Sequence, residues 1–194
     1  MNIQRFNELV VASGGRLGQS IPEWRCFLEF VETYFKARNI QKPVIFEIGV
    51  MNNAQKPFYQ ELLNADHVGI DIVGSPDILG YSQSPAVLDE LKTRLSGRMI
   101  DLLFIDGDHN YAAIKSDYEI YGPLTKHIIV FHDISHPYSP QIPEETMRFW
   151  NEVVEADRQN THFAIQHYNS ARTGITAGRQ MGIGMVIKQG GGGL

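Results

Sequence analysis

Hydrophobic residues along the chain form two kinds of segment, and their alternation predicts the fold. Short, mostly apolar runs are typical of strands that are covered on both faces of a parallel sheet. Such runs occur at residues 43–49, 67–71, 102–105 and 128–131. Between and after them, apolar residues recur at three- and four-residue spacing, which is typical of amphipathic helices. Helices are accordingly expected at residues 54–64, 84–96, 111–121 and 144–156.

The N-terminal residues carry a helical pattern of their own. A short amphipathic helix is expected within residues 1–12, and a longer one from Pro22 to Arg38. The second carries an apolar stripe made of Trp24, Phe27, Leu28, Val31 and Phe35. A stripe of this kind must be covered, so we expect it to pack against the sheet or against the partner subunit of a homodimer.

The C-terminal part predicts a hairpin. Residues 161–167 and 181–187 have the pattern of two strands, joined by the polar segment 169–180. Together with the preceding alternation, this predicts an α/β fold with a doubly wound, mostly parallel sheet, a C-terminal antiparallel hairpin and N-terminal helices. The 194 residues fit a single domain with a helical cap at 1–40, a core at 43–187 and a flexible tail at 189–194.

The composition argues against some classes of protein but does not identify the class to which this protein belongs. Hydrophobic residues make up 43% and charged residues 20% of the chain, which is ordinary for a globular protein. The net charge is −5 and basic residues do not cluster, so no nucleic-acid partner is expected. No apolar run approaches the roughly 18 residues of a membrane span, and Cys26 has no second cysteine to pair with. A cytoplasmic protein that does not bind membranes is expected.

Acidic and imidazole side chains follow two of the predicted strands. Asp106, Asp108 and His109 come after the run 102–105, and His132 and Asp133 end the run 128–131. In parallel sheets, ligands bind beyond the carboxyl ends of the strands. These side chains are therefore expected to meet in one crevice.

The ends of the first two strands indicate an adenosine-containing ligand. Gly49 lets a ligand approach the backbone closely, and Asp71 can accept hydrogen bonds from two ribose hydroxyls. Gly49 is not followed by a dinucleotide fingerprint, and the chain has no phosphate-binding Gly-Lys-Ser/Thr loop. A nucleoside without phosphates therefore fits better than a dinucleotide.

Six short motifs, taken in order, carry a resemblance to a known family. They lie at residues 46–49, 69–71, 104–111, 130–134, 148–150 and 181–184. The most specific parts are Ile-Asp-Gly-Asp-His at 105–109 and Phe-His-Asp at 131–133. The set resembles the class I S-adenosylmethionine-dependent methyltransferases, which have a Rossmann-like fold. Within that class it is similar to the small-molecule O-methyltransferase branch with the cephalosporin-hydroxylase-like and macrocin O-methyltransferase-like proteins.

The resemblance implies S-adenosylmethionine as cofactor and a role for each matching residue. Glu47 and Gly49 would lie beside the methionine part, Asp71 would hold the ribose, and the Ser82-Gln83 pair would touch adenine. The full set of cofactor residues that it implies is Glu47, Gly49, Met51, Asp71, Ser82, Gln83 and Asp106. The metal ligands that it implies, for Mg²⁺, are Asp106, His132 and Asp133.

Two departures from the family pattern bear on these roles. Met51 and Asn53 stand at the later positions of the usual glycine-rich loop, where asparagine tolerates a positive φ better than most residues. Ile134 stands where catechol-type enzymes carry an amide ligand to the metal.

The chemistry expected is methyl transfer to a hydroxyl of a small molecule or sugar. His109, with Asp106 beside it, is expected to be catalytic as a general base, because imidazole titrates near neutrality. Two other hypotheses remain. The Asp/His residues could serve a metal-dependent hydrolase, or the altered loop could mark a non-catalytic binding module with a degenerate methyltransferase fold. The Pro-rich segment 135–143 is expected to be either a lid over the substrate or a surface connection.

Overall fold

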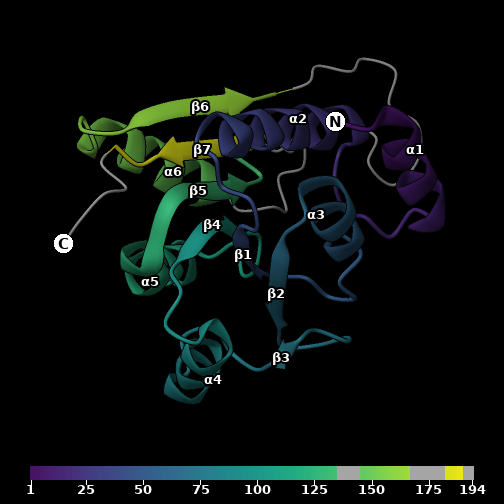
Figure 1. Cartoon of the computed structure of the whole chain (residues 1–194). Helices are drawn as coiled ribbons and strands as arrows, with labels where there is room; N and C mark the ends of the chain where they lie inside the picture. Colours follow the sequence, from purple (N-terminus) through teal and green to yellow (C-terminus); the bar gives the residue numbers. More distant parts are fainter. Residues whose placement is uncertain (135–144, 167–181, 190–194) are drawn as a thin grey trace.

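In the part of the chain that the structure describes, a seven-stranded sheet forms the centre (Figure 1). The structure is a computed structural model that describes residues 1–134, 145–166 and 182–189. The strands are β1 Val44–Ile48, β2 Asp66–Asp71, β3 Ile78–Leu79, β4 Ile100–Ile105, β5 Thr125–His132, β6 Thr161–Ile165 and β7 Ile183–Ile187. Their order in the sheet is β3-β2-β1-β4-β5-β7-β6. The first five pair in parallel, whereas β7 runs antiparallel to both β5 and β6.

Helices cover both faces of this sheet. They are α1 Ile3–Ala12, α2 Ile21–Ala37, α3 Lys56–Leu63, α4 Pro85–Leu95, α5 Tyr111–Tyr121 and α6 Glu145–Ala156, with a short 3₁₀ helix η1 at Gly122–Leu124. Because side chains alternate along a strand, Ile45 joins the apolar cluster under α1, α2 and α3, while Phe46 joins the one under α4, α5 and α6. The predicted doubly wound α/β fold is therefore confirmed. None of the described helices is long and apolar enough to cross a membrane.

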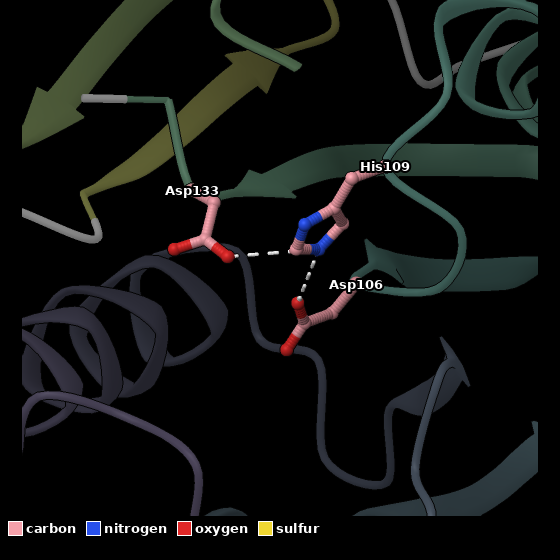
Figure 2. A group of neighbouring side chains, drawn as sticks. All are labelled: Asp106, His109 and Asp133. Atoms are coloured by element: carbon pink, nitrogen blue, oxygen red, sulfur yellow. Dashed lines mark ion pairs between the residues drawn. The ribbon is translucent and has the colours of Figure 1, made fainter. Parts of the chain in front are cut away.

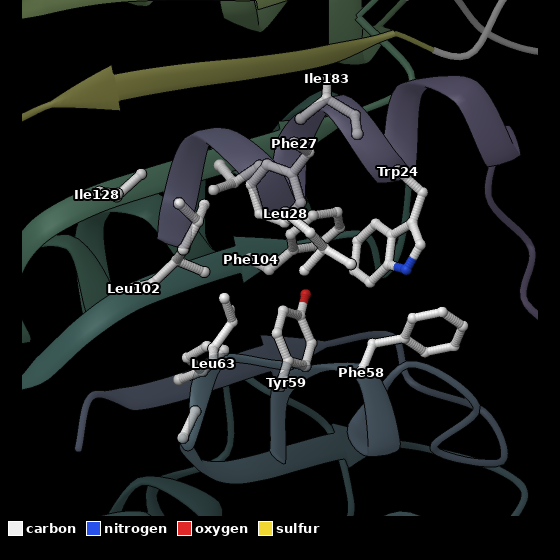
Figure 3. Packing of buried hydrophobic residues seen from close by; sticks show 14 of the residues in the cluster. Trp24, Phe27, Leu28, Phe58, Tyr59, Leu63, Leu102, Phe104, Ile128 and Ile183 are labelled. Atoms are coloured by element: carbon white, nitrogen blue, oxygen red, sulfur yellow. The ribbon is translucent and has the colours of Figure 1, made fainter. Parts of the chain in front are cut away.

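The apolar stripe on α2 is buried within the chain (Figure 3). The ring centroids of Trp24 and Phe27 lie 5.9 and 5.5 Å from that of Phe104 on β4, in edge-on contacts. The rest of the stripe belongs to the same buried cluster. Packing against the chain's own sheet is thus confirmed, and this stripe offers no surface to a partner subunit.

The predicted elements are present among the described residues, with ends that differ by at most three residues, and two short elements, β3 and η1, were not predicted. Residues 72–78 contain the glycine, serine and proline of a turn, yet Ile78 at their end pairs with Ile70 of β2 and belongs to β3. Two residues carry no periodicity, so only the neighbouring strand defines β3. The C-terminal hairpin is confirmed, with β6 at the sheet edge. The predictions for residues 135–143, 169–180 and 190–194 lie outside the described residues.

Candidate active site

A cavity of about 460 Å³ lies at the carboxyl ends of β1, β2 and β4. Its walls combine apolar side chains with a few polar groups, which is usual for small-molecule sites. The predicted cofactor residues among its lining are Gly49, Met51, Asp71, Ser82, Gln83 and Asp106. Gly49 and Asp106, which are 57 positions apart in the sequence, thus line one cavity, as expected for residues at the ends of parallel strands.

Gly49 is required where β1 and β4 end side by side. Its φ is +92°, and a Cβ on it would lie 2.0 Å from the carbonyl oxygen of Asp106. No other residue fits there without moving one of the strand ends. Gly49 was expected to let a ligand approach the backbone, and the structure shows that it lets the ends of β1 and β4 lie close together.

The loop after β1 is held by Asp71. Its Oδ2 accepts a hydrogen bond from the Met51 amide at 2.7 Å, and its Oδ1 accepts one from the Val73 amide at 3.1 Å. Met51 and Asn53 both have positive φ, of 48° and 55°. Asn53 therefore preserves the turn as predicted, and each Asp71 oxygen keeps a further lone pair for a ligand.

The Ser82-Gln83 pair is fixed by a residue that the sequence did not single out. Asp117 on α5 accepts hydrogen bonds through Oδ1 from Ser82 Oγ at 2.6 Å and from Gln83 Nε2 at 2.8 Å. Burial raises the pKa of Asp117 to about 6, although these two hydrogen bonds lower it. One feature of the sequence could have indicated Asp117. It lies on the same face of α5 as Ile114 and Tyr121, and this face is buried, where a carboxylate is unusual.

Glu47 is the one predicted cofactor residue that does not line the cavity. Side chains alternate along β1, so Glu47 points to the face opposite Phe46 and Ile48. It is completely buried, and its Oε2 lies 2.9 Å from His67 Nε2. Burial raises the pKa of Glu47, and His67 opposes that change. The structure thus pairs Glu47 with His67, and its contact with the methionine part stays a prediction.

Three side chains at the ends of β4 and β5 form a cluster that could hold a metal ion (Figure 2). His109 Nε2 lies 3.6 Å from Asp106 Oδ1 and 3.5 Å from Asp133 Oδ2. One nitrogen or oxygen atom from each of the three residues lies within 4.8 Å of the others. Two carboxylates and one imidazole suit a divalent cation such as Mg²⁺ or Mn²⁺, the imidazole favouring the transition metal.

The predicted metal ligands Asp106, His132 and Asp133 also lie close together. His132 is buried, and its Nδ1 lies 3.0 Å from Asp106 Oδ1, so it orients a carboxylate of the cluster. The group of three contains His109, which was expected as a general base, and not His132, which was predicted as a ligand. His132 Nδ1 also lies 3.7 Å from Asp133 Oδ2, so both imidazoles face both carboxylates, and the role of His132 as a ligand stays a prediction.

Electrostatic coupling within the cluster favours charged groups. Hydrogen bonding to Asp106 raises the pKa of His109, and burial opposes this. Burial alone would lower the pKa of His132, but Asp106 beside it raises that pKa above its usual value. Burial would likewise raise the pKa of Asp106, and the two imidazoles lower it. Asp106 thus favours the protonated form of each imidazole, and the two imidazoles favour its ionised form.

Two further residues complete the local arrangement. Asp108 lines the cavity and its Oδ1 accepts from the Asn110 amide at 3.0 Å, so it is not in the metal cluster. Gln19, in the connection between α1 and α2, donates through Nε2 to Asp106 Oδ2 at 3.0 Å. Its 87-residue separation from Asp106 explains why no local pattern revealed it.

Sequence comparisons find little. No protein-family model matches the chain. The uncharacterized protein R132 of Acanthamoeba polyphaga mimivirus is 36% identical over 88 residues, which cover 43% of this chain. The matching part spans only 39% of that relative.

Solved structures share the architecture at low identity. An O-methyltransferase from Bacillus cereus in complex with S-adenosylhomocysteine is 15% identical, with a TM-score of 0.53 over 94% of this chain and 90% of that one. A putative caffeoyl-CoA O-methyltransferase from Staphylococcus aureus is 15% identical, with a TM-score of 0.55 over 97% of this chain and 93% of that one.

A third structure contains a metal. The MycE methyltransferase of the mycinamycin biosynthetic pathway, in complex with Mg, S-adenosylhomocysteine and mycinamycin VI, is 15% identical with a TM-score of 0.52. The match covers 81% of this chain and 48% of that one. Identities this low establish architecture rather than activity. The chain has the fold of the class I S-adenosylmethionine-dependent methyltransferases.

Proposed function

We propose that the protein is an S-adenosylmethionine-dependent methyltransferase that acts on a hydroxyl of a small molecule or sugar, with a divalent metal at the reacting end. One observation carries the proposal. The cavity that Gly49, Asp71, Ser82 and Gln83 line shares Asp106 with the Asp106/His109/Asp133 cluster. The structural neighbours bound to S-adenosylhomocysteine support this choice of cofactor.

The cavity's own groups match the parts of the cofactor. The free lone pairs of Asp71 would accept from the ribose hydroxyls, and Ser82 and Gln83 would lie at the adenine. A cavity of about 460 Å³ is within the usual range for a ligand of this size. With the nucleoside in this orientation, the sulfonium group would lie toward Asp106.

The acceptor oxygen attacks the methyl carbon in line, the C–S bond breaks, and its electrons stay on the sulfur, which leaves as the thioether of S-adenosylhomocysteine. Asp106 and Asp133 flank His109 and stabilise its imidazolium form, so His109 Nε2 can take the proton that the acceptor loses. A divalent cation in the cluster would lower the pKa of the acceptor hydroxyl and orient it. His109 Nε2 serves as base or as ligand, and metal titration separates the two roles.

Calorimetric titration with S-adenosylhomocysteine, with and without Mg²⁺, tests the proposal. We expect a dissociation constant of about 1–100 µM for the wild type, comparable with usual substrate affinities. Asp71→Ala should weaken binding at least about 30-fold, because charge-assisted hydrogen bonds to the ribose are lost. Asp89→Ala, an exposed residue on α4, is the matched control.

Each outcome has a consequence. Binding that Asp71→Ala removes would justify a screen of hydroxyl acceptors for the mass increase of one methyl group. Absence of binding under both conditions would refute the methyltransferase, and phosphatase activity would then favour the metal-dependent hydrolase. Cofactor binding without turnover of any acceptor would favour the non-catalytic binding module.

A further inference from the structure

Gln19 is a buried glutamine that contacts the metal cluster from a distant part of the chain. It is 7% exposed and lies in the connection between α1 and α2. Its Nε2 donates to Asp106 Oδ2 at 3.0 Å, while its Oε1 is buried without a hydrogen-bond partner among the described residues. Burying an amide with one group unpaired costs free energy, so packing alone does not explain a glutamine at this position.

The hydrogen bonds around Asp106 divide its two carboxylate oxygens. Oδ1 lies 3.0 Å from His132 Nδ1 and 3.6 Å from His109 Nε2, whereas Oδ2 accepts from Gln19. The torsion that turns a carboxylate has broad minima, so the side chain itself does not fix the plane of this group. A partner at each oxygen fixes it, and Gln19 is the partner at Oδ2.

The backbone on both sides of Gln19 is fixed, so its amide is held rigidly. Leu17 is buried in the apolar cluster under α1, α2 and α3, and its carbonyl oxygen accepts from Gln55 Nε2 at 3.1 Å. On the other side, Ser20 is the N-cap of α2, and its carbonyl oxygen accepts from the Trp24 amide at 2.8 Å. A donor that is held by ordered elements positions its partner more precisely than a donor on a free loop.

We propose that Gln19 is a positioning residue that holds the Asp106 carboxylate in the orientation in which the cluster binds a divalent cation. Residues that orient a metal ligand in this way contribute to the affinity of the site. A neutral donor suits this role, because the charge of a lysine or arginine would repel the cation. The inference rests on the metal site of the proposed function and does not depend on the identity of the cofactor.

The test measures the binding of Mn²⁺ alone, through the EPR signal of the free ion. Gln19→Met keeps the length of the side chain but removes the donor, and we expect it to weaken Mn²⁺ binding about 10- to 100-fold. Gln55→Met is the matched control. It removes another buried glutamine, whose amide donates to Leu17 in the same connection instead of to the cluster. Because Gln55 shares no partner with Asp106, we expect Gln55→Met to change the Mn²⁺ affinity less than about 3-fold.

Urea denaturation of both variants separates this role from a structural one. Lower denaturation midpoints with Mn²⁺ affinity close to that of the wild type in both variants would overturn the inference. Equal loss of affinity in both variants would also overturn it, because the connection as a whole would then be responsible. Should Gln19→Met fail to fold, Gln19→Asn replaces it, since its shorter amide cannot reach Asp106 Oδ2. Wild-type Mn²⁺ affinity in that variant would contradict the inference.

Titration of the wild type with S-adenosylhomocysteine separates this inference from the proposed function. If S-adenosylhomocysteine does not bind but Gln19→Met still weakens Mn²⁺ binding, the methyltransferase is refuted and the positioning role of Gln19 stands. Failure of the wild type to bind Mn²⁺ overturns the positioning role. Binding of S-adenosylhomocysteine in that case would leave a methyltransferase that works without a metal.

Discussion

At the scale of single residues, Asp117 makes the stability of the protein depend on pH. Burial raises the pKa of its carboxyl from 3.8 to about 6, so the folded protein holds this proton more tightly than the unfolded chain. The associated stabilisation is fully present below about pH 4 and is lost as the pH rises through about 6. A shift of this size corresponds to at most about 3 kcal/mol.

Asp117→Asn should remove this pH dependence. The amide cannot ionise, so we expect the variant to gain about 1–3 kcal/mol of unfolding free energy relative to the wild type between about pH 4 and pH 7. Urea denaturation at several pH values measures the difference. Asp89→Asn should show no such trend, because Asp89 is exposed. A difference between Asp117→Asn and the wild type that is independent of pH would show that the carboxyl titrates as it does in water.

At the scale of elements, the sequence predicts those helices and strands whose pattern is contained in their own residues. The apolar stripe of α2 and the runs of β4 and β5 repeat with the period of their own structure, so they could be predicted. The two-residue β3 could not, since only its pairing with β2 defines it. Glu47 shows the same limit: its position on β1 was clear, but the face to which it points depends on how the helices pack on the sheet.

The packing of α2 on the sheet predicts a large cost for removing one ring. Phe27 is completely buried, with ring centroids 5.3 Å from Trp24 and 5.5 Å from Phe104. Phe27→Ala should lower the free energy of unfolding by about 3–5 kcal/mol, as measured by urea denaturation. The neighbouring Cys26 is exposed, so Cys26→Ala should change the free energy of unfolding by less than about 0.5 kcal/mol. A small effect at Phe27 would mean that α2 is held mainly by other contacts.

At the scale of the whole molecule, parallel strand ends explain why so much of the site was predictable. Strands that run in one direction bring their last residues to one edge, and this placed Asp71, Asp106 and Asp133 correctly without any knowledge of contacts. The residues that were missed, Gln19 and Asp117, reach the site from other elements. Gln19 comes from the connection before α2, and only the complete fold brings it to Asp106.

The exchange of His132 for His109 in the metal cluster is a prediction about the assembled site. Both His109 Nε2 and His132 Nδ1 lie within 4 Å of Asp106 and Asp133, but His132 is buried and hydrogen-bonded to Asp106 at 3.0 Å. If Mn²⁺ binds here, its pulsed EPR spectrum should show coupling to an imidazole nitrogen, because histidine is a common ligand of such cations. His109→Asn should abolish this coupling.

His132→Asn separates a ligand from a residue that orients one. We expect it to weaken Mn²⁺ binding about 10- to 100-fold through Asp106 and to leave the nitrogen coupling in place, as substitutions of supporting residues do. His127→Gln, at the other end of β5, is the control and should change neither quantity. Loss of the coupling in His132→Asn, with retention in His109→Asn, would restore the ligand set expected from the resemblance. It would also mean that His132 turns away from Asp106 when the cation binds, so that His109 keeps its nitrogen free to act as the base.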